Sequence, residues 1–77
     1  MTALAKWCEA MAAWTEDPGA DPVLASEVSH TFAALSGPDA SNALLIERSI
    51  GRSDRHTAAA TYREHAAVLN DHTRRIG

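Results

Sequence analysis

Residues Asp21 to Leu35, DPVLASEVSHTFAAL, carry the clearest structural pattern in this chain. Asp21 is a good N-cap residue, because its carboxylate can accept hydrogen bonds from the free N–H groups of a first helical turn. Pro22 follows at the first helical position, where a missing N–H costs nothing. Core-type residues then recur every three or four positions, and Gly37-Pro38 closes the segment. We predict an amphipathic helix whose stripe forms the core around which the rest of the chain packs. The stripe consists of Leu24, Val28, Thr31, Phe32 and Leu35.

A second helix is predicted before this one, from about Thr2 to Glu16. It ends before Pro18-Gly19, a dipeptide that is typical of a turn. The break is short, so the two helices should form an antiparallel helical hairpin over residues 2–36.

Two more helices are predicted after the hairpin. Asp39 is a candidate N-cap for a helix over residues 40–50, and Gly51 marks its end. Ser53 or Asp54 can then cap a long C-terminal helix over residues 55–75, which we expect to pack across the hairpin. No run of residues alternates with a period of two, so no strand is expected. The predicted fold class is all-α: a three- to four-helix bundle forming one small domain over residues 1–77.

The composition predicts a core that is short of large side chains. Apolar residues make up 45% of the 77 residues, but sixteen of them are alanines. Domains of this size often gain stability from disulfides, a metal ion or oligomerisation. The single cysteine, Cys8, excludes an intrachain disulfide, and it lies within an apolar stripe, where we expect a buried and unreactive thiol. Self-association into a homo-oligomer is therefore the favoured additional source of stability.

Charge is distributed unevenly along the chain. Residues 1–42 carry a net charge of −5, and residues 43–77 carry six arginines and a net charge of +2.

Lys6 and Glu9 interrupt the N-terminal apolar run, which is unlike a signal peptide. No window approaches the roughly eighteen apolar residues that a membrane-spanning helix needs. We therefore expect a cytoplasmic protein that has no membrane segment.

Glu27 and His30 have the Glu-x-x-His spacing that ferritin-like di-metal proteins use. Glu64 and His65 are candidate companions. At about 100° per residue, however, Glu27 and His30 point well away from the apolar stripe of their helix. They would face solvent in a monomer, so a carboxylate and histidine metal site is an alternative hypothesis that requires an interface between subunits.

Trp7 and Trp14 lie seven residues apart on one edge of the first predicted helix, and tryptophan is enriched at interaction hot spots. Leu44 and Leu45 point away from the face of the third helix that Ala43, Ile46 and Ile50 share. Apolar side chains on several sides of a short helix are typical of contact with a second chain. These four residues, Trp7, Trp14, Leu44 and Leu45, are the predicted partner-binding residues.

Catalysis is not expected, since the chain has neither a nucleophile elbow nor a phosphate-binding Gly-rich loop, and no cofactor is implied. A helix-turn-helix DNA-binding regulator is a second alternative, but only Arg48 falls within the candidate recognition helix, which makes nucleic acid a poor match.

The leading interpretation is a small non-catalytic helical interaction module. It would self-associate and act as an adaptor, a regulator or a small subunit of a larger assembly, with a protein as its partner.

Overall fold

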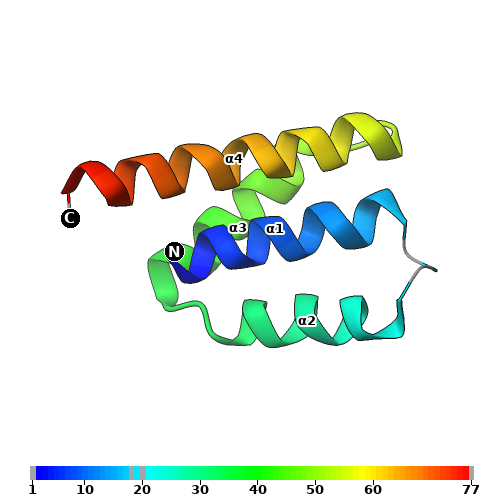
Figure 1. Cartoon of the computed structure of the whole chain (residues 1–77), viewed down its shortest axis with the longest axis horizontal. Coiled ribbons are helices and arrows are strands. Elements are labelled where there is room, and N and C mark those ends of the chain that lie inside the picture. The colour runs from blue at the N-terminus through cyan, green and yellow to red at the C-terminus, as the bar shows by residue number, and fades with distance from the viewer. Residues whose placement is uncertain (1, 18, 20, 77) are drawn as a thin grey trace.

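The computed structural model of the chain describes residues 2–17, 19 and 21–76, and side chains as far as residue 71 (Figure 1). Within these ranges the chain forms four helices and no strand. They are α1 (Ala3–Glu16), α2 (Pro22–Ala33), α3 (Gly37–Ile50) and α4 (Arg55–Ile76). The predicted all-α class is confirmed, as is the antiparallel hairpin of the first two helices.

Local capping explains where α1 and α2 begin. The Ala5 N–H donates to the Thr2 hydroxyl oxygen at 3.1 Å, which caps α1. The Val23 N–H donates to the Asp21 carboxylate at 2.9 Å, and Pro22 opens α2 as predicted. Each bond satisfies an N–H group that has no acceptor within its own helix.

The predicted start of α3 was wrong. The helix begins at Gly37, three residues before Ala40, and Asp39 lies inside its first turn instead of capping it. Pro38 does not prevent this early start, because the N–H groups of a first turn have no helical acceptor in any case. The Asp39 carboxylate still stabilises the helix there through the positive end of its dipole.

The predicted boundary between α3 and α4 is confirmed. Gly51 follows the last residue of α3 with φ at +57°, a conformation that residues with a Cβ rarely adopt. Asp54 then caps α4, since its carboxylate accepts from the Thr57 N–H at 3.0 Å and from the Thr57 hydroxyl at 2.9 Å. These two bonds hold the pKa of Asp54 below its ordinary value.

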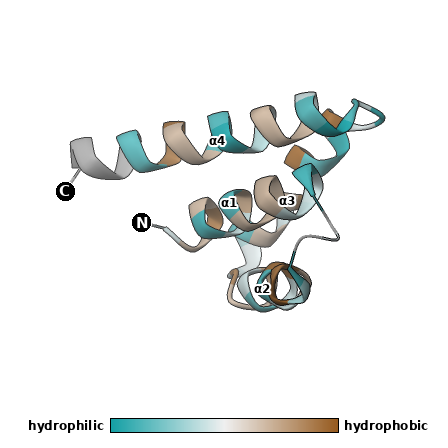
Figure 2. Cartoon of the chain, turned by 45° about the vertical axis from the view of Figure 1, so that its right-hand side comes forward, coloured by the Kyte–Doolittle hydropathy of each residue, from teal (hydrophilic) through white to brown (hydrophobic). Residues whose placement is uncertain are grey.

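α1 is the central element of the fold. α2 and α4 lie along opposite sides of α1, each antiparallel to it, and α3 crosses behind it (Figure 1). The turned view in Figure 2 again places α4 and α2 on opposite sides of α1 and α3. α4 therefore packs along α1, not across the hairpin as predicted.

The core lies around α1, and the prediction that the stripe of α2 forms its centre was wrong. α1 buries seven residues, whereas α2 buries none completely. α2 contacts one side of α1, so Val28 remains half-buried, as does Leu35 just after the end of α2. α1 has neighbours on several sides, because its alanines and those of α4 allow close approach. The buried residues of α1 are Leu4, Ala5, Trp7, Cys8, Ala10, Met11 and Ala12.

Trp7 connects three of the helices. Its ring centroid lies 5.7 Å from that of Tyr62 on α4, in an edge-to-face arrangement. It lies 6.2 Å from the centroid of Phe32 on α2, with the ring planes tilted by 58°. Such pairs stabilise a core beyond simple burial. The indole of Trp7 thus holds α2 and α4 to the central helix.

Candidate interaction site

The two pairs of the alternative metal site lie on different helices on opposite sides of α1. Glu27 and His30 are exposed on α2, as their angular positions predicted, and Glu64 and half-buried His65 lie on α4. Among the described residues, no group of three or more His, Cys, Asp or Glu side chains is arranged to hold a metal ion. One chain therefore does not bring the four residues together. A site shared between two chains stays a prediction.

The four predicted partner-binding residues divide into a buried one and three exposed ones. Trp7 is only 2% exposed, so we correct its assignment from partner-binding edge to core. Trp14 is 37% exposed, Leu44 51% and Leu45 61%. The α3 face shared by Ala43, Ile46 and Ile50 points inward as predicted, which leaves both leucines outside.

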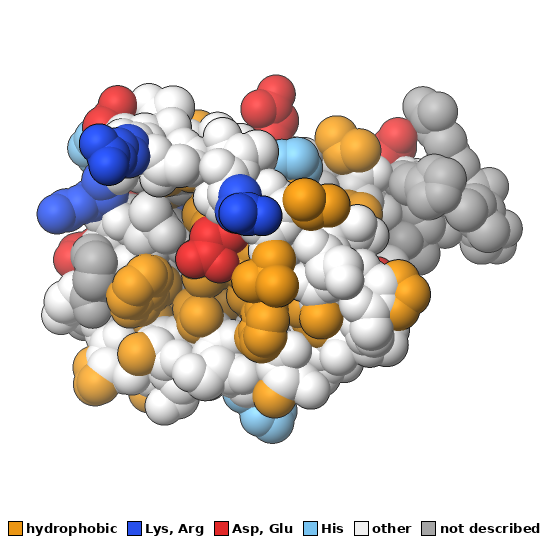
Figure 3. Space-filling model, turned by 180° about the vertical axis from the view of Figure 1, so that it is seen from behind, with side chains coloured by type: hydrophobic (Ala, Val, Ile, Leu, Met, Phe, Trp, Pro, Cys, Tyr) orange, Lys and Arg blue, Asp and Glu red, His pale blue; other side chains and the backbone are white. Residues whose placement is uncertain are grey.

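A hollow of about 400 Å³ opens where α1, α2 and α3 meet, and we call it the aromatic hollow. Trp7 lies in it as a buried ring, and Trp14 and Phe32, both 37% exposed, border it. Seen from behind, Figure 3 shows hydrophobic side chains gathered over part of this side of the molecule, with an acidic side chain among them. The apolar lining consists of Trp7, Met11, Trp14, Val28 and Phe32, and its polar members are Ser29 and Glu47.

The sequence pattern identified only part of this hollow. The spacing of Trp7 and Trp14 predicts one edge of it, whereas the periodicity of α2 predicts a core position for Phe32 and no motif contains Glu47. Glu47 follows Ile46, which faces the core, so a helical wheel of α3 would have placed it beside the buried face. Its contribution to the hollow depends on how α3 crosses α1, which a wheel does not describe.

Among the residues that the structure describes, Glu47 is the one charged residue that lines the aromatic hollow. Its carboxylate has no ion-pair partner among the described residues. Burial, reinforced by the negative charge of Glu47, raises the pKa of Tyr62 to about 12. The hollow therefore combines aromatic faces with one uncompensated negative charge.

Cys8 lies beneath the surface, within the core. Its side chain is fully buried, and burial together with the nearby charge of Glu9 raises the pKa of its thiol to about 11. A thiol of this kind is a poor nucleophile, because the thiolate is the reactive form. The predicted burial of Cys8 is confirmed, and its low reactivity stays a prediction.

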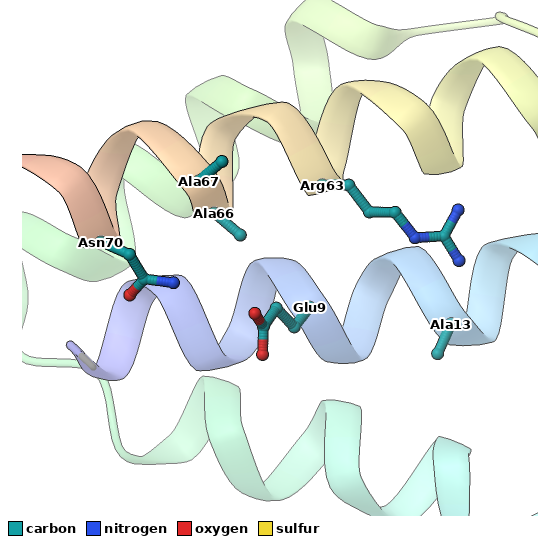
Figure 4. A pocket seen from close by; sticks show the side chains of 6 residues that line it. All are labelled: Glu9, Ala13, Arg63, Ala66, Ala67 and Asn70. Atoms are coloured by element: carbon teal, nitrogen blue, oxygen red, sulfur yellow. The ribbon is translucent and has the colours of Figure 1, made fainter.

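A second open groove, of about 480 Å³, runs between α1 and α4 (Figure 4). Ala13, Ala66 and Ala67 line it, and Glu9 and Asn70 supply polar groups. Arg63 extends from α4 over α1, where it forms an ion pair with Glu16. Since both partners are largely exposed, this pair contributes modestly to stability.

Comparison with known proteins gave no match among protein-family models, curated proteins or solved structures. Within the part of the chain that the structure describes, no helix is long and apolar enough to cross a membrane. Any functional inference therefore depends on the chain's own surface, of which the aromatic hollow is the most distinctive part.

Proposed function

We propose that this chain is a small, non-catalytic interaction module that binds a protein partner through the aromatic hollow and the neighbouring leucines of α3. The observation that carries this proposal is the exposure of large apolar side chains around one concave region. Trp14 and Phe32 border the hollow, and Leu44 lies one turn before Glu47 on α3. Interfaces favour aromatic anchors beside a pocket, and contiguous exposed apolar surface marks such sites.

We further propose that a second copy of the chain is one such partner. Leu44 and Leu45 are more than half exposed on a helix whose inner face already packs against the core. A second chain covering them would add apolar burial to a core that consists largely of alanines. Oligomerisation is one of the ways in which domains of this size gain stability.

Sedimentation of charged variants tests self-association. We expect the wild-type chain to sediment as a dimer or a larger oligomer at tens of micromolar, and a Leu44→Glu/Leu45→Glu variant to sediment as a monomer. Burying two carboxylates in an apolar contact is costly, whereas the same residues are harmless in water. Val68→Glu is the matched control, since Val68 is 65% exposed on α4 and should leave the oligomer intact. Far-UV circular dichroism must show equal helicity for all three chains.

A well-folded wild-type monomer at these concentrations would remove the self-association. The binding proposal would then depend on a different protein partner. A photo-crosslinking amino acid at position 14 should capture that partner in host cells, and the same group at position 68 should not. Equal capture from both positions would contradict binding at the hollow.

A further inference from the structure

We infer that the aromatic hollow binds the guanidinium group of an arginine side chain that the protein partner presents. This inference rests on the proposed function, because the partner supplies the arginine. It specifies what the hollow recognises, which is a cation on an apolar stem.

The rings around the hollow have the chemistry of a cation site. The face of an aromatic ring carries partial negative charge and attracts a cation within about 6 Å of its centre, with tryptophan the most effective ring. Three of the residues that line this hollow are aromatic, and two of these are tryptophans. Trp14 and Phe32, each 37% exposed, present accessible aromatic surface to the hollow, and the centroid of the buried Trp7 ring lies 6.2 Å from that of Phe32.

The charge of the hollow selects the sign of its ligand. Glu47 is its one charged residue and has no ion-pair partner among the described residues. An incoming cation would pair with this carboxylate, whereas an anion would be repelled by both the carboxylate and the ring faces. The lining therefore complements positive charge specifically.

Arginine fits this lining better than lysine does. Its planar guanidinium stacks on an aromatic face while its N–H groups, which lie in the same plane, remain free to reach a carboxylate. Met11 and Val28 line the hollow and can pack against the methylene stem. The ring contact with the buried Trp7 already restrains Phe32, so little ordering of that ring is needed on binding.

The two tryptophans of the chain provide a direct measurement, since both line the hollow. An ¹⁵N-labelled chain shows their two indole N–H groups as separate NMR signals. N-acetyl-arginine amide should shift the signal of the exposed Trp14 in a saturable manner, and that of the buried Trp7 much less. N-acetyl-citrulline amide has the same shape without the charge, and it should bind about tenfold more weakly.

Two glutamate-to-glutamine variants test whether the carboxylate of Glu47 is responsible for the preference for arginine. Glu47→Gln should remove most of the preference for arginine over citrulline, and Glu64→Gln, an exposed change on α4, should leave it unaltered. Both positions are exposed, so folding should be preserved, which the spread of the remaining amide signals reports.

Equal shifts with arginine and citrulline amides would overturn the inference, as would tetramethylammonium binding as tightly as the arginine amide. An unchanged preference in Glu47→Gln would also overturn it.

These titrations need neither self-association nor a protein partner. A monomeric wild-type chain that still prefers arginine would contradict the proposed dimer alone. A partner crosslinked at position 14 but insensitive to excess arginine amide would contradict this inference alone.

Discussion

Trp7 contributes more contacts between helices than its position in the sequence suggests. It is 2% exposed and meets aromatic rings of both α2 and α4. Trp14 lies two turns further along the same edge of α1 and is 37% exposed. It is near the end of α1, where the neighbouring helices cover it incompletely. Position along the helix, and not angular position alone, separates a core residue from a surface residue here.

Replacing Trp7 should therefore be far more damaging than replacing Trp14. Truncating a buried tryptophan to alanine costs about 3–5 kcal/mol, a large part of the total stability of a small domain. We expect Trp7→Ala to be mostly unfolded or to unfold at much lower urea concentration. Trp14→Ala should lose no more than about 1–2 kcal/mol. Urea unfolding followed by far-UV circular dichroism measures both losses, and losses of equal size would contradict the assignment of Trp7 to the core.

The packing of α2 differs from that of the other elements. Its N-terminus is capped by Asp21 and its stripe is regular, yet none of its residues is fully buried. α1 shows the opposite combination, since it is surrounded by neighbours and buries seven residues. Strong local signals and peripheral packing therefore occur together in α2, whereas tertiary contacts dominate the stability of α1.

Amide hydrogen exchange should reveal this difference. We expect the amides of α2 to exchange well before those of α1 in the native state, because α2 can detach without opening the core around Trp7 and Cys8. The slowest amides should lie in α1 and in the part of α4 that contacts it. Exchange of α2 and α1 at the same rate would show that the four helices open only as a unit.

The described part of the core contains two ionisable groups, the Cys8 thiol and the Tyr62 hydroxyl. Burial is the main reason that the pKa of the Cys8 thiol rises from 9.0 to about 11 and that of the Tyr62 hydroxyl from 10.0 to about 12. Both groups are neutral when protonated, and the folded state holds their protons more tightly than the unfolded chain does. Their contribution to stability is thus complete below the unfolded values and is lost as pH rises through the folded ones.

We therefore predict that the free energy of unfolding falls between about pH 9 and pH 12. Urea unfolding midpoints measured at increasing alkaline pH should decrease through this window. A Cys8→Ala variant should begin its decrease about one pH unit later, since Tyr62 then remains as the first buried group to ionise. A midpoint that stays constant across the window would show that neither group is buried in solution.

Much of the helical framework was predictable from the sequence because its signals are local. Capping by Asp21 and Asp54, termination at Gly51 and the outward direction of Leu44 and Leu45 depend on residues within a turn or two of each position. The outward direction of Glu27 and His30 followed from the same helical geometry. The start of α3 was misplaced by three residues because Gly37 and Pro38 resemble a stop signal and yet fit a first turn.

The sequence alone was enough to predict an all-α bundle of amphipathic helices, the cap at Asp21 and the burial of Cys8. The packing of the helices is needed to know which helix is central, which of the two tryptophans is buried, and that Phe32 and Glu47 share a hollow with Trp14. The reason is that the spacing of apolar residues in a helix specifies only the direction in which its apolar face points from the helix axis. Burial and neighbours depend on how many other helices meet that stripe, and here α1 has three such neighbours whereas α2 packs chiefly against one.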